Sequence, residues 1–354
     1  MISSPASSAL RRLETEEHGG ARETLPAQVV VLGMHRSGTS AVTRVLNMMG
    51  LWVGPPNAFP PADEGNPTGY WEYREVWALN EAVLGALGTT WCTVDHLDLE
   101  RLGPLARAHF EQRARHAVDT LDRGGSWVIK DPRLCVLFPL WRAVLERPLC
   151  VLIHRDPLAV ARSLQQRDGM PLLQGIALWE LYNRRALAAS HGLPRIVVSY
   201  RELVGDPEGT ARYLHRGLAR LAGAKAAGLS LPSASDLCAF VAPSLDRHPE
   251  NPALTEGYLN QQQAALRRSL GDGSALDLDP VPPLSAGAQE ILSNASALSQ
   301  ANGRIGELDT LLSAVFASHS WKLGAALTRL ARRLLGRPTA ISAAERRDRL
   351  MQGD

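Results

Sequence analysis

The segment GMHRSGTS, residues 33–40, combines residue types that bind anions. A run of β-branched residues ends at Leu32, a turn bounded by glycines follows, and an amphipathic helix is predicted to begin at Thr39 or Ser40. A helix that starts after such a turn directs several backbone N–H groups and the positive end of its dipole at one point. The residues expected to hold an anion there are Gly33, Arg36, Ser37, Gly38, Thr39 and Ser40.

The spacing of this loop is close to that of the P-loop, G-x-x-x-x-G-K-[ST], but Thr39 stands where that motif has its lysine. The P-loop lysine reaches the β- and γ-phosphates of a nucleoside triphosphate, so its replacement argues against triphosphate hydrolysis. The cation of this loop is instead Arg36, whose planar guanidinium suits a phosphosulfate bound without a metal. A glycine-rich turn that binds nothing is the alternative for this segment.

A second segment that places a cation at the end of a predicted strand is PLCVLIHRDPLAVARSL, residues 148–164. Leu149 to Ile153 form a buried-type strand, Arg155 follows its carboxyl end, and Asp156 with Pro157 predicts a helix start. Ser163 lies about two helical turns further on, so its hydroxyl and the guanidinium of Arg155 can meet at one phosphate.

Lys130 is a third candidate, at the end of the predicted strand SWVIK. The chain has 38 lysines and arginines together, but its only lysines are Lys130, Lys225 and Lys322. A compact ammonium differs from a guanidinium in geometry and hydration, so a lysine here suggests a specific role. A chance replacement of arginine at a strand end remains the alternative.

These segments resemble the sulfotransferases that use 3′-phosphoadenosine 5′-phosphosulfate (PAPS). GMHRSGTS is similar to their 5′-phosphosulfate loop in its bacterial form, and Arg155 with Ser163 resembles their R-x7-S element for the 3′-phosphate. The resemblance implies that Lys130 lies near the transferring sulfonate. In the cytosolic branch a histidine two residues after that lysine is the base, but Pro132 occupies that position here.

The resemblance also covers other segments. NPTGYWE, residues 66–72, is similar to a segment of bacterial members, and it implies that Glu72 is the general base, which a carboxylate of raised pKa can be. The alternative is a carboxylate that only stabilises the start of the following helix, predicted from about Glu72 to Leu87. His96 is the second candidate base. Tyr200 is expected near the adenine, and Arg247 is expected in a loop over the 3′-phosphate, although the R-K-G-x-x-G-D-W sequence of the cytosolic branch is absent.

Composition limits the class of protein. The 354 residues can bury a sizeable core, and a formal net charge of +2 indicates no nucleic-acid surface. No run of about 18 apolar residues and no secretory signal core is present, which favours a cytoplasmic protein. The four scattered cysteines are interpreted as reduced thiols, and no metal site is expected.

Strands that alternate with helices predict an α/β fold with a central parallel β-sheet flanked by helices. Together with the resemblance, this implies the P-loop-like fold of sulfotransferases. Residues 1–26 are expected to be a flexible arm, 27–284 the sulfotransferase domain, and 285–354 a helical tail.

The tail carries two patterns. Apolar residues repeat every seven positions from Ile291 to Leu312, but Gly303 and Gly306 favour a short helical hairpin or a partner contact over a long coiled coil. Residues 321–335 form a basic amphipathic segment that can lie on the inner face of a membrane, dock on a protein or remain solvated. SHSWK, residues 318–322, resembles the tail of some bacterial enzymes of cell-surface glycans.

The expected function is therefore transfer of a sulfonate from PAPS to a hydroxyl or amine of an acceptor, of which a carbohydrate or glycolipid of the cell envelope is the favoured class. Two alternatives stay open. The first is a P-loop kinase or nucleotidase acting on a small molecule, which requires ATP and magnesium. The second is a nucleotide-binding assembly factor that has lost turnover.

Overall fold

The computed structural model describes residues 26–56, 58–59, 71–223, 228–241 and 247–335. The expected arm, residues 1–26, and the segment 60–70 therefore lie almost wholly outside the described residues. By its internal contacts the chain separates into two compact units, residues 1–295 and 296–354. The expected domain boundary, between residues 284 and 285, lies close to the start of the helix that crosses from the first unit into the second.

The first unit is built on a four-stranded parallel sheet with strand order β2-β1-β3-β4. The strands are β1 (Gln28–Leu32), β2 (Trp127–Lys130), β3 (Pro148–His154) and β4 (Arg195–Ser199). Strands β1, β2 and β3 occur where the sequence predicts them, and the parallel sheet with its flanking helices confirms the α/β class. Strand β1 pairs in parallel with β2 on one side and with β3 on the other, with Val31 opposite Lys130 and Leu32 opposite Leu152.

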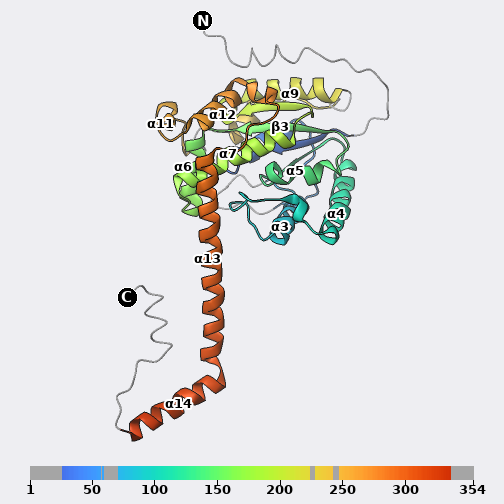
Figure 1. The fold of residues 1–354 in the computed structure, drawn as a ribbon. Helices are drawn as coiled ribbons and strands as arrows, with labels where there is room; N and C mark the ends of the chain where they lie inside the picture. The colour runs from blue at the N-terminus through green and yellow to red at the C-terminus, as the bar shows by residue number, and fades with distance from the viewer. Residues whose placement is uncertain (1–25, 57, 60–70, 224–227, 242–246, 336–354) are drawn as a thin grey trace. The chain divides into compact units, whose positions relative to one another are not determined.

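Helices cover both faces of this sheet (Figure 1). Those of the first unit are α2 (Thr39–Met48), α3 (Arg74–Ala86), α4 (Pro104–Asp122), α5 (Leu134–Arg142), α6 (Pro157–Asp168), α7 (Leu172–Ala189), α8 (Tyr200–Gly205), α9 (Pro207–Ala222), α10 (Ala234–Phe240), α11 (Pro252–Glu256) and α12 (Gln261–Asp272). Residues of β1 alternate between two cores: Val29 and Val31 pack with α2 and α9, whereas Val30 and Leu32 pack with α3, α4, α5 and α7. Because both faces are buried, the strand is apolar from Val29 to Leu32.

The site-bearing segments all follow strand ends. The loop after β1, residues 33–38, leads into α2, and the turn after β3 leads into α6. Because the strands are parallel, their carboxyl ends meet at one edge of the sheet, where ligands bind in open α/β folds. The side chain of Asp156 caps α6 by accepting hydrogen bonds from the N–H groups of Leu158 and Ala159, and Pro157 is the first helical residue, as predicted.

Two predicted helices differ from the structure. Helix α3 begins at Arg74, so Glu72 precedes it and Glu75 is the acidic residue of its first turn. Helix α13 (Ala286–Ala317) is continuous over 32 residues, so the predicted short hairpin is wrong. Gly303 and Gly306 each cost a helix only about 1 kcal/mol, which is too little to end one with many other backbone hydrogen bonds. Helix α14 (His319–Leu334) follows.

All four cysteines are free thiols. None of the helices among the described residues combines the length and the apolar character that crossing a bilayer requires.

Candidate functional site

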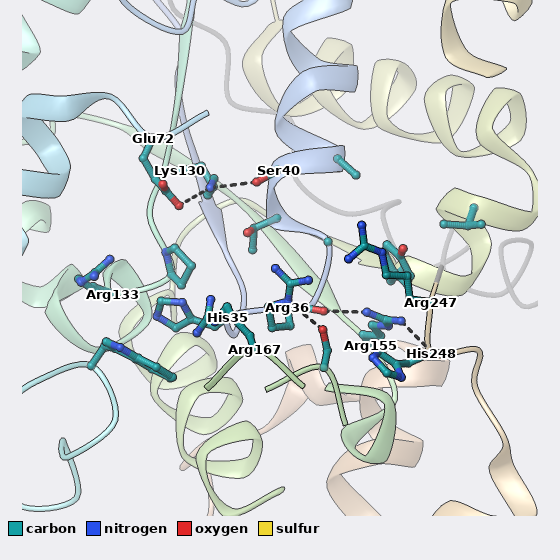
Figure 2. Close-up of a pocket in the computed structure, with 18 of the residues that line it drawn as sticks. His35, Arg36, Ser40, Glu72, Lys130, Arg133, Arg155, Arg167, Arg247 and His248 are labelled. Carbon is teal, nitrogen blue, oxygen red and sulfur yellow. Dashed lines mark hydrogen bonds and ion pairs between the residues drawn. The ribbon is translucent and has the colours of Figure 1, made fainter. Parts of the chain in front are cut away.

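A pocket of about 460 Å³ lies at the carboxyl edge of the sheet. The loop after β1, the end of β2 and the turn after β3 all contribute to its wall, together with α6, Tyr200 and the segment around Arg247. These segments are far apart in the sequence, and Figure 2 shows their side chains around one cavity. The tertiary structure thus brings most of the predicted site residues together.

The turn at the centre of the pocket depends on residues with a left-handed backbone. Arg36 has φ 68° and Gly38 has φ 87°, and the N–H of Ser37 donates to the carbonyl of Met34 over 3.1 Å. A Cβ on Gly38 would lie 2.2 Å from Cδ2 of Tyr200, so glycine is required both for the conformation and for the contact. The Tyr200 ring therefore packs directly against the turn.

The N-terminus of α2 forms one side of the pocket. Its N-cap residue is Gly38, which has no side chain to bind the first N–H groups, and Thr39 and Ser40 line the cavity beside it. Backbone N–H groups at a helix start carry partial positive charge that the helix dipole increases. This end of the pocket has the donors and the charge that a phosphate or sulfate group requires.

Arg155 links the turn to the other side of the pocket. Its guanidinium donates to the carbonyl oxygen of Arg36 over 3.0 Å and to that of His248 over 2.9 Å, and it lies over the ring of Tyr200 at 4.4 Å from the centroid. Nε of Arg36 donates to Oγ of Ser163 over 2.8 Å. The loop after β1 and the Arg155–Ser163 element are therefore in direct contact (Figure 2).

Lys130 and Glu72 form a buried ion pair on the opposite side of the turn. Nζ of Lys130 lies 2.5 Å from Oε1 of Glu72 and donates to Oγ of Ser40 over 3.2 Å. Burial raises the pKa of Glu72 above its ordinary value of 4.5, while the ammonium of Lys130 acts in the opposite direction. A carboxylate whose pKa is raised is a stronger proton acceptor than an exposed one.

The strand end that carries Lys130 is held by a buried hydrogen-bond network. Asp131 is fully buried and accepts hydrogen bonds from Nδ2 of Asn80 over 2.9 Å and from Nη1 of Arg133 over 3.0 Å. Asn80 in turn accepts from the indole of Trp141 over 2.8 Å. The rotamers around Lys130 are thus restrained by partners on α3 and α5.

The sequence analysis did not single out His35. Its buried ring lines the pocket and packs 4.4 Å from that of Trp91 between centroids, and its Nε2 has no hydrogen-bond partner among the described residues. Burial, followed by the charges of Arg133 and Arg167, lowers the pKa of His35 well below 6.5, so the imidazole is neutral. The sequence signal for His35 is its place inside the loop after β1, between Met34 and Arg36.

Three predicted site residues lie outside the pocket lining. The side chain of His96 is largely exposed, and its Nε2 lies 3.0 Å from Asp95 and 3.3 Å from Oγ of Ser293. His96 therefore lies outside the pocket and contacts Asp95 and Ser293. Gly33 and Ser37 lie behind the turn, where a Cβ on Gly33 would be 2.7 Å from the carbonyl oxygen of Ile153, and they shape the loop.

The charge of the pocket is strongly positive. The cations that line it are Arg36, Lys130, Arg133, Arg155, Arg167 and Arg247, and the carboxylates are Glu72 and Asp168. Arg247 is exposed at the edge, beside His248 (Figure 2). Among the described residues no group of three or more histidines, cysteines or carboxylates is arranged to hold a metal ion. The arrangement suits a ligand with more than one anionic group.

Two solved structures are similar to this chain. The chain is similar, at 18% identity and a TM-score of 0.39, to the sulfotransferase domain from the Synechococcus PCC 7002 olefin synthase, with 74% of this chain and 100% of that domain covered. It is also similar to the sulfotransferase domain from the curacin biosynthetic pathway, at 18% identity and a TM-score of 0.37, with 77% and 99% covered. No curated protein matches the chain.

A family profile provides the assignment. The profile described as the sulfotransferase family matches residues 26–219, which is more than half of the chain and includes the loop after β1, Lys130, Arg155 and Ser163. The chain therefore belongs to the sulfotransferase family.

Proposed function

We propose that this protein transfers a sulfonate group from PAPS to a hydroxyl or amine of an acceptor. The observation that carries the proposal is the contact between two anion-binding elements inside one pocket: Nε of Arg36 lies 2.8 Å from Oγ of Ser163, and Arg155 binds the carbonyl of Arg36 over 3.0 Å. A nucleotide with phosphate groups at both its 5′ and 3′ ends matches such a pair of elements better than a simple adenosine phosphate does.

The residues fit this donor. The uncapped start of α2, with Thr39, Ser40 and the nearby ammonium of Lys130, would hold the phosphosulfate end. Arg155 and Ser163 would hold the 3′-phosphate, with Arg247 at the edge of the pocket. Tyr200, packed against the turn, would offer its ring to the adenosine. Because burial lowers the pKa of His35, its imidazole is neutral and adds a polar group to the cavity without adding charge.

PAPS supplies an activated sulfonate whose departure leaves adenosine 3′,5′-bisphosphate. The task of the protein is to orient the donor and to stabilise the negative charge that develops on the oxygens around sulfur. Lys130 and Arg36 are the cations placed for this, and a preorganised donor of this kind contributes roughly 3 kcal/mol to the stabilisation of a transition state. Arg155 and Ser163 would position the nucleotide without taking part in the chemistry.

Glu72 is the proposed general base. Its carboxylate is buried at the pocket beside Lys130, and its pKa is raised by burial, so it can accept the proton of an attacking hydroxyl. The role of a carboxylate that only stabilises a helix start does not suit Glu72, because α3 begins at Arg74. The ion pair with Lys130 also keeps the base next to the cation that contacts Ser40.

For the acceptor we propose a carbohydrate or glycolipid of the cell envelope, with the reaction taking place in the cytoplasm. The support is the resemblance of SHSWK, residues 318–322, to the tail of bacterial enzymes of cell-surface glycans. The experiment is incubation with radiolabelled PAPS and cell-envelope fractions, followed by separation of polysaccharide, lipid and protein. Label in protein alone would contradict this acceptor class, and nucleotide binding without any transfer would favour the non-catalytic alternative.

Calorimetry tests the donor directly. We expect adenosine 3′,5′-bisphosphate to bind without magnesium and ATP with magnesium to bind at least tenfold more weakly, because the loop has Thr39 in place of the P-loop lysine. A preference for magnesium ATP would contradict the proposal and favour a kinase or nucleotidase.

A further inference from the structure

The charge of the chain is unevenly distributed. Residues 310–344 contain no aspartate or glutamate but include five basic residues, Lys322, Arg329, Arg332, Arg333 and Arg337. The whole chain has 38 basic and 36 acidic residues, so the rest of it has more acidic than basic groups. A segment with charge of one sign only favours a partner of the opposite sign.

Helix α14, His319–Leu334, lies within this segment and has a narrow apolar face. Leu323, Leu327, Leu330 and Leu334 follow the spacing i, i+4, i+7, i+11, which places them within an arc of about 60° around the helix. Their exposed fractions lie between 56% and 80%, and no residue of α14 is buried. Four leucines in one stripe are thus in contact with solvent, which costs free energy unless a partner covers them.

The basic residues of α14 occupy the other side of the helix. Lys322, Arg329, Arg332 and Arg333 fall within an arc of about 100° that is centred roughly opposite the leucines. Trp321 is in the first turn, with its ring 5.0 Å from that of Phe316 between centroids and 42% of its surface exposed. Tryptophan is typical of the boundary between water and hydrocarbon.

We propose that α14 binds the surface of an anionic phospholipid bilayer, with its leucine face in the acyl boundary and its basic residues at the headgroups. The separation of the two faces matches an interfacial helix, whose long basic side chains reach the headgroup phosphates while the apolar face is buried. A nucleic acid would use the cations but leave the leucines exposed. A second copy of α14 would cover the leucines, but it would bring equal positive charge to the contact.

The test is co-sedimentation of the full chain with vesicles. One set contains phosphatidylcholine alone, and the other contains about one-third phosphatidylglycerol, the anionic lipid. We expect binding to the anionic vesicles, at least tenfold weaker binding to the neutral ones, and a loss of binding as salt is raised, because exposed charges are screened. Equal binding to both sets, or no binding to either, would overturn the proposal.

Two variants separate the contributions of the two faces. Arg329→Gln/Arg332→Gln/Arg333→Gln should lose binding to anionic vesicles, by about fivefold for each arginine. Its matched control is Arg212→Gln/Arg216→Gln/Arg220→Gln on α9, which removes the same charge from three exposed positions and should bind normally. Equal losses in both triple variants would mean that net charge alone drives binding, which would overturn a specific role for α14.

The leucine face has its own comparison. Leu323→Ala/Leu327→Ala should weaken binding at least tenfold, whereas Leu308→Ala/Leu312→Ala, on exposed positions of α13, should not. Sedimentation equilibrium of the same variants detects self-association. A dimer that only the α14 leucine variant abolishes, with no lipid binding by the unaltered chain, would identify a second copy as the partner and overturn the proposal. Calorimetry with adenosine 3′,5′-bisphosphate on each variant keeps this result separate from the proposed enzymatic function.

Discussion

The ammonium of Lys130 lies 2.5 Å from a carboxylate oxygen of Glu72, and both side chains are buried at the pocket. These residues are 58 positions apart in the sequence and come from the end of β2 and from the segment before α3. In the proposed reaction, Lys130 would contact a sulfonate oxygen and Glu72 would accept the proton of the attacking hydroxyl. A buried ion pair is costly to desolvate, so its presence in a cavity is evidence for a functional role.

Glu72→Gln should reduce kcat by about 10² to 10⁴-fold, because the amide cannot accept the proton of the acceptor. The amide keeps the size of the side chain, so the affinity for adenosine 3′,5′-bisphosphate should change little. The measurement is radiolabelled sulfonate transfer together with calorimetry. The matched control is Glu75→Gln, which removes a carboxylate that pairs with Arg113 outside the pocket lining. Full turnover in Glu72→Gln with normal nucleotide binding would assign the base role to another residue.

The pH dependence of kcat/KM provides an independent test of the same base. Burial raises the pKa of Glu72 above 4.5, and a base acts only when it is deprotonated. The rate should therefore rise with pH, with the midpoint of the acidic limb above 4.5, and this limb should disappear in the residual activity of Glu72→Gln. An unchanged acidic limb in that variant would show that a different group titrates.

Ser163→Ala should weaken binding of adenosine 3′,5′-bisphosphate by about tenfold, because one hydrogen bond to a charged group contributes about 1.5 kcal/mol. Binding of adenosine 5′-phosphosulfate, which lacks the 3′-phosphate, should change much less. Arg155→Ala should also lose more affinity for adenosine 3′,5′-bisphosphate than for adenosine 5′-phosphosulfate, and its loss for the bisphosphate should exceed that of Ser163→Ala. Calorimetry with both nucleotides measures the difference, and equal losses for the two would argue against a 3′-phosphate site here.

Gly38→Ala should destabilise the protein by more than about 2 kcal/mol and weaken nucleotide binding. The alanine would have to keep the backbone angle φ 87°, and its Cβ would lie 2.2 Å from the Tyr200 ring. Gly88→Ala is the matched control, since Gly88 has φ 67° but no atom within 4 Å of its would-be Cβ, so only the backbone strain of about 1 kcal/mol remains. Urea unfolding measures both variants. Equal destabilisation would show that the contact with Tyr200 is easily relieved.

The free energy of unfolding should decrease as pH falls from 6.5 toward 4. Burial lowers the pKa of His154 to about 4 from 6.5, so between these values the unfolded chain binds a proton that the folded chain excludes. The contribution of His154 is at most about 3 kcal/mol. His35 acts in the same direction. Urea unfolding at several pH values should show a shallower slope for His154→Phe, and an identical slope would show that this imidazole does not exclude the proton.

Local sequence determined a large part of the fold. Local patterns of apolar residues, glycines and capping side chains predict strands β1, β2 and β3, the start of α2 at Thr39 and the capped start of α6 at Asp156. Such signals act within a few residues of the chain, and they do not require knowledge of its path.

Four features of the structure do not follow from local sequence patterns. The pairing of Glu72 with Lys130 and the burial of His35 depend on packing between segments that no sequence pattern relates. The exclusion of His96 from the pocket depends on the path of the loop that places it beside Asp95 and Ser293. Helix α13 is continuous because the hydrogen bonds of a long helix outweigh the local preference of two glycines.

The sequence by itself therefore determined which residue types could bind a doubly anionic nucleotide and which strands carry them, because those signals are local. Only the tertiary structure decided that Arg36 contacts Ser163 and that Lys130 contacts Glu72. The physical reason is that a parallel sheet with order β2-β1-β3-β4 brings the carboxyl ends of distant strands to one edge. Burial at that edge then determines which charged side chains pair and how the pKa values of the titratable groups shift.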